Sequence, residues 1–102
     1  MANGRIATYV HSDSTTENKG AAMVRVTTET DFAARTDEFK KFAQDAAMYT
    51  YGALSHTRAF IAGPDMWNMI ITQFPRLEDD RKMLERELRE SVRVSEIVIL
   101  RL

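Results

Sequence analysis

The chain has 102 residues, of which 44% are hydrophobic and 28% are charged, and its formal net charge at pH 7 is −1. This length and balance describe one small globular domain, and the near-neutral charge gives no electrostatic signature of nucleic-acid binding. Because the chain contains no cysteine, disulfides and thiolate chemistry are excluded. No signal-peptide layout or membrane-length apolar run is recognisable, so we expect a cytoplasmic protein without a membrane partner.

A hairpin is expected at the start of the chain. The segments from Arg5 to Val10 and from Ala21 to Thr28 have strand-like patterns, and the second alternates apolar with other side chains. The polar run from His11 to Gly20 lies between them. This run is too long for a two-residue turn, so we predict a long hairpin loop.

A long helix is expected from Asp37 to near Leu54. Apolar residues and one threonine recur at helical spacings of three and four and define its buried face: Phe39, Phe42, Ala43, Ala46 and Thr50. Thr36 is a suitable N-cap, and acidic residues in the first turn complement the helix dipole. The aromatic stripe is interpreted as core rather than as a cofactor site.

Two further helices are expected in the second half of the chain. Gly63-Pro64 interrupts the regular pattern of the chain. Asp65 can then cap a short helix, and Pro75 closes that helix. The next helix is predicted from Leu77 to Glu90, with Leu77, Leu84 and Leu88 as its buried stripe. Its charges are spaced to form surface pairs, Glu78–Lys82 and Glu85–Arg89.

The segment from Val92 to Leu100 is rich in β-branched residues and predicts a final strand. Its alternation slips near Ser95-Glu96, which predicts a bulge. The element order is therefore β-β-α-α-α-β. We expect a single domain over 1–102 of the α+β class, with a three-stranded antiparallel sheet and helices packed on one face.

The connection between the second strand and the long helix carries the most informative pattern. It reads Glu29-Thr30-Asp31-Phe32-Ala33-Ala34-Arg35-Thr36-Asp37-Glu38-Phe39. This segment resembles the Thr-Asp-Phe signature of translation elongation factor Ts, the exchange factor that drives GDP off elongation factor Tu. The stretches Gly4-Arg5-Ile6, Val24 to Tyr51 and Leu77 to Ile97 extend the resemblance along the first core subdomain of that family.

The chain also departs from the family pattern. Family members usually carry an N-terminal helical docking module and a second core subdomain, and neither is expected in these residues. Thr28 stands where a cysteine is common, and Ala33 stands where a valine is common. The region from Phe60 to Phe74 matches no part of the family that we recognise. The pattern is that of one module isolated from a larger factor.

The resemblance implies a partner-binding site at Thr30, Asp31, Phe32 and Arg35. In the family, the Asp-Phe tip enters the G domain of elongation factor Tu beside the magnesium and phosphate site, and the aromatic side chain shifts the elements that hold the metal. Asp31 would orient nearby backbone N–H groups, Thr30 would shape the turn, and Arg35 could pair with an acidic group of the partner. No catalytic residue, bond chemistry or cofactor is implied.

Other interpretations of the same residues stay open. Phe32 could pack under the long helix as a core residue, and Arg35 could be an ordinary surface charge. The chain could then be an interaction module that keeps the fold and binds or sequesters a partner without nucleotide exchange. His11 and His56 lack neighbours at metal-ligand spacing, so no metal site is expected.

A lone subdomain could leave apolar surface uncovered, which favours a homodimer. The candidate surface is the cluster Met66, Trp67, Met69 and Ile70. The alternative is that these residues complete the core of the monomer.

Overall fold

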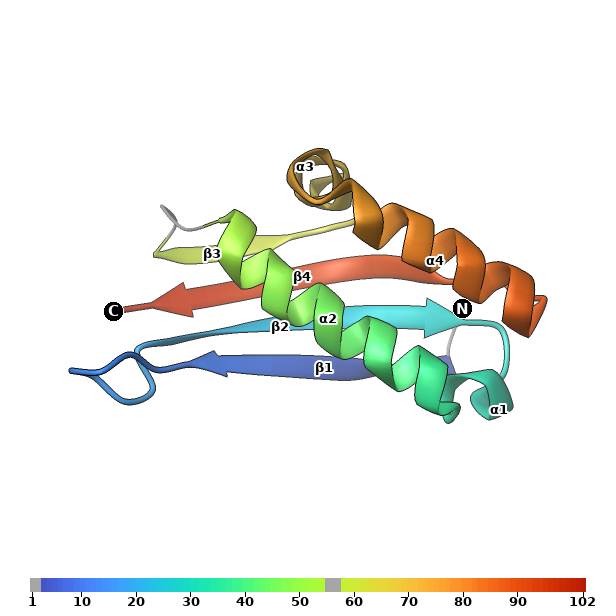
Figure 1. Cartoon of the computed structure of the whole chain (residues 1–102), viewed down its shortest axis with the longest axis horizontal. Helices are drawn as coiled ribbons and strands as arrows, with labels where there is room; N and C mark the ends of the chain where they lie inside the picture. The colour runs from blue at the N-terminus through green and yellow to red at the C-terminus, as the bar shows by residue number, and fades with distance from the viewer. Residues whose placement is uncertain (1–2, 55–57) are drawn as a thin grey trace.

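The computed structural model describes residues 3–54 and 58–102, and these residues form one antiparallel sheet with helices against it (Figure 1). The strands are β1 (Asn3–His11), β2 (Gly20–Thr28), β3 (Ala59–Ala62) and β4 (Arg93–Arg101), in the sheet order β1-β2-β4-β3. The helices are α1 (Asp31–Ala34), α2 (Asp37–Ala53), α3 (Met66–Gln73) and α4 (Pro75–Leu88). In Figure 1, α2 and α4 lie across the near face of the sheet, and α1 lies at the end where β2 finishes.

The α+β class is confirmed, whereas the prediction of three strands is wrong. The additional strand β3 spans only four residues and pairs antiparallel with β4, with Ile61 opposite Val98. It is followed directly by Gly63 and Pro64. A segment this short, ended at once by turn residues, offers too few positions for alternation to reveal a strand.

The alternation of β2 decides which face of the sheet is covered. Ala22, Val24 and Val26 are buried beneath the helices, whereas Met23 and Arg25 between them are exposed on the opposite face. This pattern is that of an antiparallel sheet with one face packed and one face solvated. The core therefore forms between the sheet and the helical layer.

The bulge predicted in the last strand is confirmed. Arg25 pairs with Glu96, but the next residue, Val26, pairs with Val94. Ser95 is therefore the extra residue, and its hydroxyl donates to the backbone carbonyl of Arg25 at 3.3 Å. The insertion returns Val94 and Ile97 to the buried face on both sides of the bulge.

The long helix α2 begins and packs as its sequence predicts. The Thr36 hydroxyl accepts the backbone N–H of Phe39 at 3.2 Å, which caps the first turn. The residues expected on its buried face are all buried: Phe39, Phe42, Ala43, Ala46 and Thr50. This helix is the main cover of β1 and β2.

The charged helix α4 differs from the prediction at both ends and in its ion pairs. It begins at Pro75, which occupies its first turn, and ends at Leu88 because Arg89 adopts the left-handed conformation with φ of 57°. Arg81 pairs with Glu78 and with Glu85, the second pair at 3.0 Å, in place of the predicted pairs with Lys82 and Arg89. Arg81 also donates to the backbone carbonyl of Val92, directly before β4, at 2.9 Å.

Helix α3 contributes two of the four residues of the predicted self-association surface to the core of the monomer. Trp67 and Ile70 are buried, and the Trp67 ring meets Phe42 edge-on with centroids 6.0 Å apart. Of the four residues predicted to form that surface, Met69 is the large exposed one. Asp65 makes no side-chain cap hydrogen bond, so its predicted capping role is also wrong. None of the helices in the described ranges is both long and apolar enough to span a membrane.

Candidate functional site

The connection from β2 to α2 forms a projecting tip built on the single turn α1. The Thr30 hydroxyl accepts the backbone N–H of Ala33 at 3.1 Å and caps this turn. Ala33 and Ala34 are buried against the domain, whereas Phe32 is 83% exposed. This exposure excludes the alternative that Phe32 is a core residue.

The charged residues of the tip pair with each other. A carboxylate oxygen of Asp31 lies 2.9 Å from Nε of Arg35, one turn away, and both side chains are mostly exposed. Such a pair contributes little to stability, because water screens it well. Both groups are therefore available to exchange this contact for one with a partner.

Glu90, in the connection between α4 and β4, binds the backbone that leads into the tip. Its Oε1 accepts the hydroxyl of Thr28 at 3.0 Å and the N–H groups of Glu29 and Thr30 at 3.1 and 2.9 Å. Its Oε2 accepts the Thr30 hydroxyl at 2.6 Å. In return, a carboxylate oxygen of Glu29 accepts the N–H of Ser91 at 3.1 Å. We call these reciprocal contacts the clasp.

Glu85, at the other end of the segment from Glu85 to Glu90, also binds backbone, while Arg86, Glu87 and Arg89 between them are exposed. The carboxylate of Glu85 accepts the N–H of Val92 at 2.9 Å, so both ends of this segment hold backbone groups. The signal that could have revealed Glu90 is topological. Since β2 runs antiparallel to β4, the residues after the end of β2 must lie beside those before the start of β4.

The hydrogen bonds of the clasp lower the pKa of Glu90. The Thr30 hydroxyl contributes most, and the Thr28 hydroxyl and the N–H groups of Thr30 and Glu29 act in the same direction, so the pKa falls below its ordinary value of 4.5. These donors stabilise the carboxylate and not the protonated acid.

We predict a pH-dependent stabilisation by Glu90 with a definite sign. Because its pKa is lowered in the folded state, the contribution is complete above the unfolded value of 4.5 and is lost as pH falls through the folded value. The unfolding free energy of the unmodified chain minus that of Glu90→Gln should be constant near pH 7 and should shrink below about pH 4. Urea unfolding of both proteins across this range measures it. A difference that does not change with pH would contradict the prediction.

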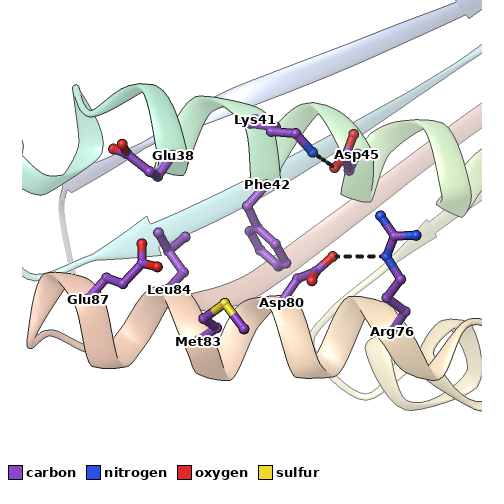
Figure 2. Close-up of a pocket in the computed structure, with 9 residues that line it drawn as sticks. All are labelled: Glu38, Lys41, Phe42, Asp45, Arg76, Asp80, Met83, Leu84 and Glu87. Carbon is purple, nitrogen blue, oxygen red and sulfur yellow. Dashed lines mark hydrogen bonds and ion pairs between the residues drawn. The ribbon is translucent and has the colours of Figure 1, made fainter.

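A groove between α2 and α4 is a second candidate site (Figure 2). Phe42 lies in it, but the charges along it are largely paired within each helix: Lys41 with Asp45 at 3.0 Å and Arg76 with Asp80 at 3.8 Å. These pairs are the i,i+4 contacts of ordinary helix surfaces. The groove is therefore interpreted as the seam where α2 packs against α4.

Metal chemistry receives no support from the part of the chain that the structure describes. Within it, no group of three or more histidine, cysteine, aspartate or glutamate side chains could hold a metal ion. The ring of His11 hydrogen-bonds to the Tyr9 hydroxyl at 2.9 Å and stacks on Tyr51. His56 lies outside the described residues.

The fold and the tip together define an α+β module that presents an aromatic side chain at one end of an antiparallel sheet. The chain is 34% identical over 92 residues to elongation factor Ts of Frankia alni, and this alignment covers 87% of the chain and 40% of that protein. It is 37% identical over 84 residues to the chloroplastic elongation factor Ts of Galdieria sulphuraria, covering 82% of the chain and 39% of the relative. With elongation factor Ts of Arthrospira platensis, 33% identity extends over 99 residues, 97% of the chain and 36% of the relative.

The chain is an elongation factor Ts-related module, as these matches along most of its length show. It spans 40%, 39% and 36% of the length of these three relatives. No family model and no solved structure gives a significant match to the chain.

Proposed function

We propose that the chain binds elongation factor Tu and promotes GDP release through the tip formed by Thr30, Asp31, Phe32 and Arg35. The observation that carries this proposal is the exposure of Phe32, 83% accessible at the end of a capped turn. A large rigid ring can be buried at an interface with little loss of rotamer entropy, which suits it to wedge between elements of a partner.

The proposed mechanism is a shift of populations rather than bond chemistry. The module would bind the nucleotide-free conformation of the GTPase more tightly than the GDP-bound one, and by linkage this lowers the affinity for GDP by the same factor. The negative charge of Asp31 would act in this step by disfavouring the arrangement of GTPase groups around the bound nucleotide. No cofactor and no catalytic residue of this chain is needed, and the site of action would be the cytoplasm.

Release of a fluorescent GDP analogue from elongation factor Tu tests the proposal. We expect the release rate to rise with the concentration of the chain. No acceleration, together with binding in a calorimetric titration, would contradict exchange and favour the second candidate, a module that sequesters the factor. Absence of binding as well would overturn both. Because a stable interface buries on the order of 1,600 Å², we expect a single small module to need high concentration.

Self-association stays a separate proposal, and the predicted surface on α3 no longer supports it. Since Trp67 and Ile70 are buried in the monomer, a homodimer could not use them without unpacking the core. Light scattering over a wide concentration range tests the homodimer. A molar mass equal to that of the monomer at every concentration would exclude it.

A further inference from the structure

The turn α1 is too short to hold its own conformation. It contains four residues, whereas an isolated helix in water needs about 12–15 residues to persist. Its packing against the domain comes from Ala33 and Ala34, while Asp31 and Phe32 face solvent. Something other than helix propensity must therefore fix the direction in which Phe32 points.

The clasp supplies this constraint directly before the tip. Glu90 accepts hydrogen bonds from Glu29 and Thr30, and its shortest contact is 2.6 Å to the Thr30 hydroxyl. That hydroxyl also accepts the N–H of Ala33, so carboxylate, threonine and helical turn form one continuous series of hydrogen bonds. Charge on the acceptor makes such bonds roughly twice as strong as neutral ones.

The residues of the clasp come from distant parts of the sequence. Glu90 is 60 residues from Thr30 and 62 from Thr28. The connection between α4 and β4 is therefore fastened to the connection between β2 and α1. A change at Glu90 should loosen the tip without altering any side chain that projects from it.

We propose that Glu90 is a positioning residue, which holds Phe32 in the orientation that binds the partner; this inference rests on the proposed function. A preformed tip loses less conformational freedom on binding than a loose one, so a clasp raises affinity without touching the partner. Thr30 transmits the constraint, because it bonds both Glu90 and the first turn of α1.

Amide hydrogen exchange of the free chain tests the positioning directly and needs no partner. In Glu90→Ala, the amides of Ala34 and Arg35, which close the turn α1, should exchange roughly tenfold faster or more. Glu90→Gln, which keeps one acceptor oxygen, should show a smaller increase. Glu87→Ala, a change at an exposed glutamate of α4, is the matched control and should leave these amides unchanged. Unchanged exchange in Glu90→Ala would overturn the proposal.

A double-mutant cycle with Phe32→Ala separates positioning from a general loss of stability. Glu90→Ala should weaken the affinity for elongation factor Tu, measured by calorimetric titration, roughly 2- to 10-fold in the unmodified background. It should have no further effect once Phe32 is replaced, because it acts through that ring. An equal loss in both backgrounds, or a loosened tip with full affinity, would overturn the proposal. If the unmodified chain releases no GDP, the proposed function fails, and the amide exchange alone decides whether Glu90 positions the tip.

Discussion

Phe32→Ala should remove the acceleration of GDP release while leaving the folded chain as stable as before. The ring is 83% exposed in the free protein, so its loss should change the free energy of unfolding by less than about 0.5 kcal/mol. At an interface the same side chain would be buried, which is worth about 1.5–3 kcal/mol. Binding to elongation factor Tu should therefore weaken roughly 10- to 150-fold.

Stopped-flow release of a fluorescent GDP analogue and urea unfolding of the same preparations give the two measurements. Met69→Ala is the matched control, because Met69 is an exposed apolar side chain on α3, away from the tip. It should change neither property. Equal exchange activity in Phe32→Ala and the unmodified chain would contradict a role for the ring.

Phe39→Ala should have the largest effect on the fold itself. Phe39 is fully buried on α2, and its backbone N–H donates to the Thr36 hydroxyl that caps this helix. Truncation of a buried phenylalanine typically costs about 3–5 kcal/mol, and a domain of this size has only about 5–15 kcal/mol to lose. The variant should therefore unfold at much lower denaturant concentration or be largely unfolded in buffer.

Circular dichroism during urea unfolding measures this loss. Met83→Ala on α4 is a suitable control, since Met83 is exposed and its truncation should cost less than about 0.5 kcal/mol. A midpoint for Phe39→Ala that matches the control would show that the α2 face is not the centre of the core.

The parts of the fold that the sequence predicts are those with local periodic patterns. The buried face of α2 follows from the three- and four-residue spacing of Phe39, Phe42 and its neighbours, and the bulge at Ser95 follows from a slip in alternation. The strand β3 and the turn α1 contain four residues each, too few for any period to appear. Periodicity therefore explains both the successes and these omissions.

The candidate site also contains residues that a local sequence pattern predicts and residues that it does not. The local motif between strand and helix marks Phe32 and Thr30 as site residues, and the structure shows Phe32 exposed and Thr30 capping α1. Glu90 could not be assigned from local pattern, because its partners are 60 to 62 residues away. The ion pair of Asp31 with Arg35 has a spacing of four residues, which predicts a contact only when α1 is known to be helical.

The most direct test of the account is photocrosslinking from the tip. The photoreactive analogue p-benzoylphenylalanine, placed at position 32, retains an aromatic ring, and the same analogue at position 69 serves as the control. The account predicts crosslinks from position 32 to the G domain of nucleotide-free elongation factor Tu, and fewer when GDP is in excess. Crosslinks from position 69 but not from position 32 would contradict the central claim that the Asp31–Phe32 tip engages the GTPase.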